Sequence, residues 1–489
     1  MNTLDRLTDY SVDMDAENIM DVRTEKLDPI VSSAYRYTFR LDTSAYLDKN
    51  TMLLFKCKAK TGEGANNCRL NCWNGGLGAI QNVELRIGDF SVQRINNVNL
   101  WSTMNHLYSS TPEVQNKKFS HYLQNGLKYQ VRNSQGAADE AMVGTIQPDN
   151  DNSGINYGRA DTRAGAAVNS HKIEEDESNN QLVGIPLGML LPILNTRDLP
   201  LFLFTSYKVH ITIEFNPNSS EFGNKIGAPS ANLACADGDI LFSDVNLLAD
   251  YLIFPSRVQE SVRQQTSQQG GYVMDYINVE TIQKTISAGT ANVEQQIEQR
   301  INVVNQEVHY LQAIRQFTTY DDNNNRVLLG QRCDGVSMEE IQYNINGVDY
   351  FNAGFVFNPV ELYNQCTYTL GRDLQVVSPY YINDVNHEAS MLSPPSNGIL
   401  GKYKPLMLDL RNGEPSIRGG GRMIGNYPIR IIYRRTPHAA VACDAGLGGF
   451  NIAQADTSGQ DLNIFVGVTR VVKVLSLPSG GMNVTVSDI

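Results

Sequence analysis

The stretch VELRIGDFSV (residues 83–92) alternates apolar with charged side chains, reaches Gly-Asp and then resumes an extended pattern. Successive side chains of a β-strand point to opposite faces, so Val83, Leu85 and Ile87 share one face of the strand. Gly88 tolerates the positive φ that the first central position of a two-residue hairpin requires. The stretch therefore predicts a β-hairpin with one buried and one solvated face.

The rest of the chain also favours strands and turns over helices. Short apolar-rich runs bounded by turn residues begin near residue 33, and VHITIEF (209–215) repeats the alternation. Residues 291–304 (ANVEQQIEQRINVV) fit either a helix or a strand. A chain of 489 residues exceeds one ordinary core. The economical interpretation is two β-sandwich domains in tandem.

Composition suggests where these domains begin and end. Residues 1–28 hold eight acidic and three basic residues, which predicts an acidic arm that orders only against another surface. The stretch RQQTSQQGG (263–271) has no apolar side chain and predicts a flexible linker. We therefore expect a first β-domain over 29–262, a second over 272–478, and a C-terminal tail over 479–489.

A long polar region runs from about residue 112 to residue 180 and includes the acidic run EEDE (174–177). A segment of this length without periodicity is typical of a projecting loop. We expect residues 133–180 to project from the first domain and to be cut early by proteases.

The overall charge and the cysteines limit the classes of function. The formal net charge is −12 and the pI is about 5.1, so general nucleic-acid binding is disfavoured. The seven cysteines are scattered and no secretory signal is evident, which favours reduced thiols in an intracellular protein. The most apolar stretch, 182–194, is interrupted by prolines and is too short to span a membrane.

Catalytic and metal-binding motifs are incomplete wherever they begin. HEASM (387–391) has Met391 where a zinc-protease helix needs its second histidine. Cys68 and Cys72 lack a matching pair of ligands, and DDNNNR (321–326) lacks the glycine of a calcium loop. We expect no catalytic residue, no metal site and no cofactor. A glycosidase with two paired carboxylates stays an open alternative, because such pairs form in space and leave no pattern in the sequence.

Three stretches resemble one known family, the double jelly-roll major capsid proteins of large eukaryotic DNA viruses, virophages and polinton-like viruses. They are IQNVELRIGDFSVQRI (80–95), LVGIPLGMLLPILNTRDLPLFLFTSYKVHITIEF (182–215) and LADYLIFPSRVQESV (248–262). The second is the most specific, through its proline placement and the strand that follows. The C-terminal SGGMNVTVS (479–487) is weakly similar to the close of the family's second jelly roll.

The resemblance implies an all-β protein of two tandem eight-stranded jelly rolls with long loops. It further implies homotrimers of nearly hexagonal outline that tile an icosahedral shell. The implied partners are further copies of the chain, penton proteins and other minor capsid proteins, without direct sequence-specific nucleic-acid binding. The implied location is the virion, assembled inside an infected host cell.

Two other classes of function remain as alternatives. A carbohydrate-binding or carbohydrate-active tandem β-sandwich is one, because 23 tyrosines could supply platforms for sugars. A nucleic-acid-binding protein is the other, and the net charge argues against it.

One region carries a net positive charge, although the chain as a whole is acidic. Residues 402–435 hold eight basic and two acidic residues, and this is either ordinary surface charge or a patch for an acidic partner. The acidic arm complements it in sign and size, which suggests a contact between subunits. The candidate interface residues are Asp5, Asp9, Asp13, Asp15 and Glu17 on the arm, and Arg418, Arg422, Arg434 and Arg435 on the neighbour.

Overall fold

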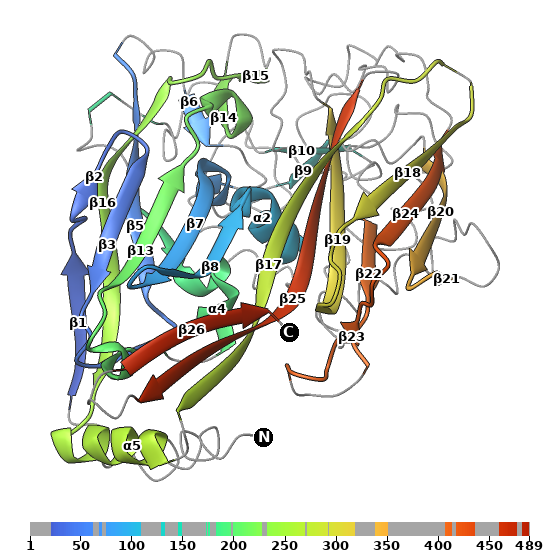
Figure 1. Cartoon of the computed structure of the whole chain (residues 1–489). Helices are drawn as coiled ribbons and strands as arrows, with labels where there is room; N and C mark the ends of the chain where they lie inside the picture. Colours follow the sequence, from blue (N-terminus) through green and yellow to red (C-terminus); the bar gives the residue numbers. More distant parts are fainter. Residues whose placement is uncertain are drawn as a thin grey trace.

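The computed structural model describes most of the chain. The described residues are 21–61, 68–70, 75–108, 129–132, 145–148, 173, 175–176, 182–196, 199–226, 232–268, 271–291, 293–317, 338–350, 406–412, 417–435, 459–476 and 482–488. They form two β-sandwiches that stand side by side, so the expected all-β, double jelly-roll architecture is confirmed (Figure 1).

The first jelly roll consists of two principal antiparallel sheets. One contains β1 (Asp21–Leu27), β4 (Tyr46–Leu47), β5 (Met52–Ala59), β11 (Leu182–Pro186), β12 (Leu199–Pro200) and β16 (Ile240–Ile253). The other has the order β2 (Val31–Ser32), β3 (Arg36–Leu41), β13 (Val209–Phe215), β7 (Ile80–Ile87) and β8 (Phe90–Asn96).

Smaller elements accompany these two sheets. They are β6 (Cys68–Leu70), β14 (Gly223–Ile226) and β15 (Asn232–Ala234) in one small sheet, β9 (Tyr129–Arg132) with β10 (Thr145–Pro148) in another, and the helices α2 (Val98–Tyr108) and α4 (Pro192–Thr196). None of the described helices is long and apolar enough to cross a membrane.

The second jelly roll also has two sheets. One contains β17 (Tyr272–Ile286), β19 (Glu307–Phe317), β22 (Leu406–Asp409), β23 (Arg422–Met423), β25 (Gln460–Ser476) and β26 (Met482–Asp488). The other has the order β18 (Gln295–Ile301), β24 (Ile429–Arg435), β20 (Met338–Ile345) and β21 (Val348–Asp349). Residues 291–304 thus contain a strand, and every residue of β18 pairs with β24.

The predicted hairpin is confirmed as β7 and β8. Val83, Leu85 and Ile87 are fully buried, and Gly88 has a φ of 59° in the connecting turn. A side chain at Gly88 would also collide with the ring of Tyr207, since its Cβ would lie 2.7 Å from a ring carbon. The glycine is therefore required both by the turn and by the close approach of Tyr207.

The arm is shorter than the sequence indicates. Residues 21–27, assigned above to the arm, form β1 and pair in antiparallel register with residues 247–253 of β16. Their exposed and half-buried side chains carry no helical or core-forming signal, but β-pairing satisfies the backbone whatever the side chains are. Residues 1–20 lie outside the described part of the chain.

The predicted flexible linker is wrong over most of its length. Residues 263–268 form the C-terminal half of helix α5 (Ser256–Gln268), which lies at the base of the first jelly roll (Figure 1). Gln259 donates hydrogen bonds to the carbonyl oxygens of Ser44 (3.0 Å) and Phe254 (3.1 Å), and Arg263 donates one to that of Phe202 (3.1 Å). Val262 packs against the core and Thr266 is buried, but the contacts of Gln259 and Arg263 are polar, so the apolar stripe of this helix is too narrow to identify it in the sequence.

The C-terminal tail is also a strand. Residues 482–488 form β26 and pair with residues 470–476 of β25, and Val484 is buried in the core. The second jelly roll therefore extends to residue 488. The expected projection of residues 133–180 falls almost wholly outside the described residues.

The register of the hairpin predicts the outcome of two substitutions. Leu85→Asp places an unpaired charge in the core and removes a buried apolar side chain, so it should cost about 3 kcal/mol or more and abolish soluble folded protein. Glu84→Gln, on the opposite face, should change the free energy of unfolding by less than about 1 kcal/mol. Soluble yield and thermal melting check both, and equal behaviour of the two variants would show the register to be wrong.

Candidate functional site

The two jelly rolls meet along a seam formed by β8 on one side and β17 and β26 on the other (Figure 1). The core of the first jelly roll continues across this seam. It includes Tyr272, Met274 and Tyr276 of β17, and Phe465 and Val474 of β25. The second jelly roll has a further core of its own. The seam is therefore an interior, and it fixes the two lobes relative to each other.

Gln93 is the polar centre of the seam. Its side chain is fully buried, although β8 is otherwise apolar toward the core. Its Nε2 donates to the carbonyl oxygen of Ile277 on β17 at 3.2 Å, and its Oε1 accepts from the backbone N–H of Ile193 in α4 at 3.1 Å. One side-chain amide thus supplies a hydrogen-bond donor to a strand of the second jelly roll and an acceptor to a helix of the first. A hydrophobic side chain could supply neither.

Further hydrogen bonds cross the seam on either side of Gln93. Tyr276 donates its hydroxyl to the carbonyl oxygen of Val92, and burial raises the pKa of this phenol so that it stays a neutral donor. Thr281 donates to the carbonyl oxygen of Asn96 at 2.8 Å. The side chains of Asn105 and Gln312 bond to each other through both amide groups at 3.2 Å.

The C-terminal strand is tied down by an arginine. Arg470 of β25 forms ion pairs with Asp488 of β26 at 2.6 Å and with Glu280 of β17 at 3.7 Å. Burial and the nearby Asp488 raise the pKa of Glu280, against the opposing effect of Arg470. Arg470 therefore links three strands of one sheet next to the seam.

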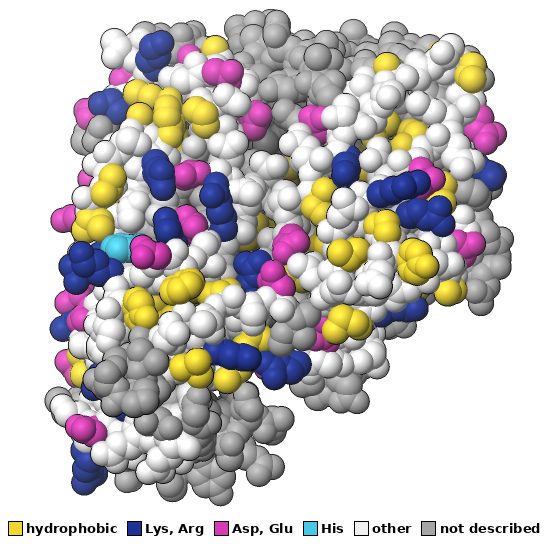
Figure 2. Space-filling model, in the orientation of Figure 1, with side chains coloured by type: hydrophobic (Ala, Val, Ile, Leu, Met, Phe, Trp, Pro, Cys, Tyr) yellow, Lys and Arg dark blue, Asp and Glu magenta, His cyan; other side chains and the backbone are white. Residues whose placement is uncertain are grey.

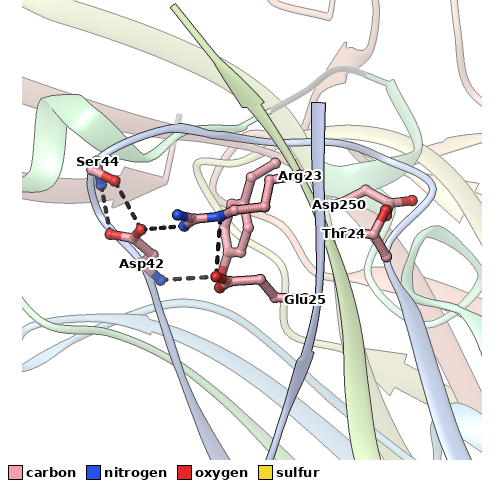
Figure 3. A network of polar contacts seen from close by, with 7 residues as sticks. Arg23, Thr24, Glu25, Asp42, Ser44 and Asp250 are labelled. Carbon is pink, nitrogen blue, oxygen red and sulfur yellow. Dashed lines mark hydrogen bonds and ion pairs between the residues drawn. The ribbon is translucent and has the colours of Figure 1, made fainter. Parts of the chain in front are cut away.

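A polar network anchors β1 at the opposite edge of the first jelly roll (Figure 3). Arg23 forms ion pairs with Asp42 at 2.8 Å and Glu25 at 3.0 Å, and its guanidinium lies 5.6 Å from the centroid of the Tyr251 ring. Burial would raise the pKa of Asp42, but hydrogen bonds from Ser44 and Arg23 outweigh it and lower that pKa. The Asp42 carboxylate thus stays ionised and holds β1 against the sandwich.

The sequence-predicted interface residues are not gathered into one site. Asp5, Asp9, Asp13, Asp15 and Glu17 lie outside the described residues, as does the side chain of Arg435. The other arginines contact groups of their own chain. Arg418 pairs with Asp275 at 2.9 Å, Arg422 lies 5.5 Å from the centroid of the Tyr350 ring, and Arg434 lies 3.8 Å from Glu294.

The described residues offer no centre for catalysis. They hold no group of histidine, cysteine and carboxylate side chains that could bind a metal ion. Cys57, Cys68 and Cys235 are buried, and burial raises the pKa of the Cys57 thiol to about 12, so Cys57 is not a nucleophile. Tyr251, Tyr276 and Tyr343 are fully buried, so these three tyrosines cannot serve as platforms for sugars.

The residues that matter for the seam were not identified from the sequence. In the sequence, nothing distinguishes Gln93 from the other polar residues of alternating strands, or Tyr276 from the other tyrosines in predicted strands. Their roles depend on the docking of a second domain almost 200 positions away in sequence, for which no local signal exists.

Comparisons with known proteins agree with this geometry. No family model and no curated protein sequence matches the chain. Among solved structures, VP54 of PBCV-1, fitted into a reconstruction of the virophage Sputnik, matches with a TM-score of 0.56 at 10% identity, covering 96% of this chain and 97% of that one. A chain of the Sputnik virophage structure matches with a TM-score of 0.56 at 11% identity, covering 96% and 89%.

A chain of the PBCV-1 capsid matches in the same way, with a TM-score of 0.54 at 10% identity, covering 96% of this chain and 97% of that one. Identities this low establish the fold and nothing further. The whole chain, both lobes included, has the double jelly-roll fold.

Gln93→Leu tests the seam. The substitution removes the buried hydrogen bonds that the Gln93 side chain makes to the carbonyl of Ile277 and to the N–H of Ile193, at a cost of about 1–3 kcal/mol each. The control is Thr281→Val, which removes an exposed hydrogen bond and should cost less than about 1 kcal/mol. Chemical denaturation measures the free energy of unfolding of both variants. An equal loss in the two would show that Gln93 contributes no more to the seam than an exposed hydrogen bond does.

Two truncations test the anchoring of β1. Deletion of residues 2–20 should lower the free energy of unfolding by no more than about 1 kcal/mol, because β1 and Arg23 stay in place and only exposed charges are removed. Deletion of residues 2–27 should lower the free energy of unfolding by about 1–3 kcal/mol, since it exposes the edge of β16 and removes the Arg23 network. Equal melting temperatures for the two truncations would show that β1 contributes nothing to stability.

Proposed function

We propose that this protein is the major capsid protein of a DNA virus and has a structural, non-enzymatic role. The observation that carries the proposal is the double jelly-roll fold, shared over 96% of the chain with chains from the PBCV-1 capsid and the Sputnik virophage. The capsid-protein motifs in the sequence, above all residues 182–215, point independently to the same family.

The seam between the two jelly rolls gives a physical reason why this subunit suits a capsid. A subunit with two similar lobes held at a fixed angle lets three copies form a ring with six nearly equivalent corners. Such a building block tiles a closed shell by repeating a small set of contacts. The buried core across the seam and the bonds of Gln93 and Tyr276 make each subunit rigid enough for this role.

The proposal includes partners and a location. Copies of the chain associate as homotrimers, and the trimers contact one another, penton proteins and other minor capsid proteins. The protein resides in the virion and is assembled inside the infected cell. Nucleic acid is enclosed by the shell without sequence-specific contact, in keeping with the net charge of −12.

We also propose an assembly role for the arm. Asp5, Asp9, Asp13, Asp15 and Glu17 would contact Arg418, Arg422, Arg434 and Arg435 of a neighbouring subunit. The sign and size of the charges support this contact. Exposed ion pairs are worth only ~0–1 kcal/mol each, so the contact would guide the register of subunits more than it would stabilise a trimer.

The mass of the purified protein in solution tests the function. Light scattering should give three times the chain mass of 54.3 kDa at micromolar concentration. Negative-stain images should show particles with a hexagonal outline. A monomer that binds glycans on an array would instead favour the carbohydrate-binding alternative and overturn the capsid proposal.

A further inference from the structure

The outer face of the sheet β2-β3-β13-β7-β8 is exposed and carries many basic side chains. In Figure 2 these dark-blue side chains gather over β3, β13 and β7. The strand registers arrange the outward residues in three rows that run across the sheet. Each row takes one residue from β3, one from β13 and one from β7.

In the first two rows, carboxylates compensate the positive charges. In the first, Arg36 lies 3.5 Å from Glu214, which also accepts a hydrogen bond from Asn82 at 2.8 Å. In the second, Thr38 and Thr212 bond to each other at 3.1 Å, and Glu84 stands opposite Arg94 of β8. Each basic residue in these two rows has a carboxylate as its cross-strand neighbour.

The third row is basic throughout. Arg40 stands opposite His210, and His210 stands opposite Arg86. Lys208 immediately precedes β13 and is close enough to His210 to act on its pKa. Within the described part of the chain, neither Arg40 nor Lys208 forms an ion pair with a carboxylate. Arg86 is only weakly compensated, because its Nε lies 3.9 Å from Glu84. We call Arg40, Arg86, Lys208 and His210 the basic row.

Such a row is unfavourable in the isolated sheet. Arg40 and Arg86 stand opposite His210 on its two sides, so a charged imidazole would face a like charge on each neighbouring strand, and such pairs are destabilising. Burial, together with Arg40, Lys208 and Arg86, lowers the pKa of His210, so the histidine avoids adding a further charge. The carboxylates nearest to it on this face, Glu84 and Glu214, stand in the compensated rows.

The first residues that the structure describes lie at the same end of the sandwich as the basic row. Arg23 of β1 bonds to Asp42 at 2.8 Å, and Asp42 follows Arg40 by two positions. Residues 1–20 hold five acidic residues and one basic residue, Arg6. A segment of this length spans up to about 66–72 Å when extended, which is ample to reach the outer face of the sheet.

We propose that the basic row is the docking surface for the acidic residues 1–20 of the same chain in the free subunit. The tether supplies a high effective concentration, so a few exposed ion pairs suffice for docking. The docked segment compensates the like charges of the row. In the assembled shell the same segment becomes available to a neighbour when it leaves this surface. The inference does not depend on the shell, since it concerns the isolated protein.

Zero-length carboxyl-to-amine cross-linking of the full-length protein tests the contact. We expect a link from Lys208 to one of the carboxylates among residues 1–20. The pair of Lys56 and Asp244, 3.1 Å apart, is the internal positive control. A mixture of isotopically heavy and light chains should place the link within one chain. A link only between chains, or only from other lysines, would overturn the proposal.

Cleavage by trypsin at Arg6 tests the charges themselves. In the double variant Arg40→Gln/Lys208→Gln the cut should become about three- to thirtyfold faster at low salt, as two exposed ion-pair contacts allow. The same acceleration should appear in the wild-type protein at ~1 M salt, where the Debye length is ~3 Å.

The matched control is Arg36→Gln, on the same strand and face but in a compensated row. It should leave cleavage at Arg6 at the wild-type rate. Equal cleavage in wild type and double variant, or equal acceleration by Arg36→Gln, would overturn the docking surface.

Discussion

The side-by-side placement of the two jelly rolls depends on one sheet that is buried on both faces. Along β25, Ile464 and Val466 lie in the core of the second jelly roll, whereas Phe465 between them lies in the core of the first. Burial on both sides explains the apolar character of this strand, since residues 461–469 leave no face for solvent. The lobes therefore cannot separate without exposing an interior.

A buried seam places strict demands on its polar groups. Water cannot reach the strand and helix termini that meet there, so every N–H and C=O needs a partner in the protein. Gln93, Tyr276 and the pair of Asn105 and Gln312 provide such partners from side chains. The apolar area supplies most of the stabilisation, and these polar contacts specify one relative position of the lobes.

The two terminal strands and the helix that connects the lobes are held by other contacts than the seam. β1 and β26 extend existing sheets at their edges, and α5 is held at the base by Gln259 and Arg263. Each combines backbone pairing or long polar side chains with a few apolar contacts, such as Val484 of β26 and Val262 of α5. Ordinary strands with exposed side chains thus complete a rigid subunit while the surface stays hydrophilic.

The sequence by itself determined the β-class, the hairpin at 83–92 and the presence of two lobes, because alternation and turn residues are local signals. It missed β1, α5 and β26, whose order comes from contacts with residues far away in sequence. It did not reveal Gln93, or the basic row in which Arg40, His210 and Arg86 meet across three strands. Only the strand registers decide which side chains become neighbours, and register is a property of the assembled sheet.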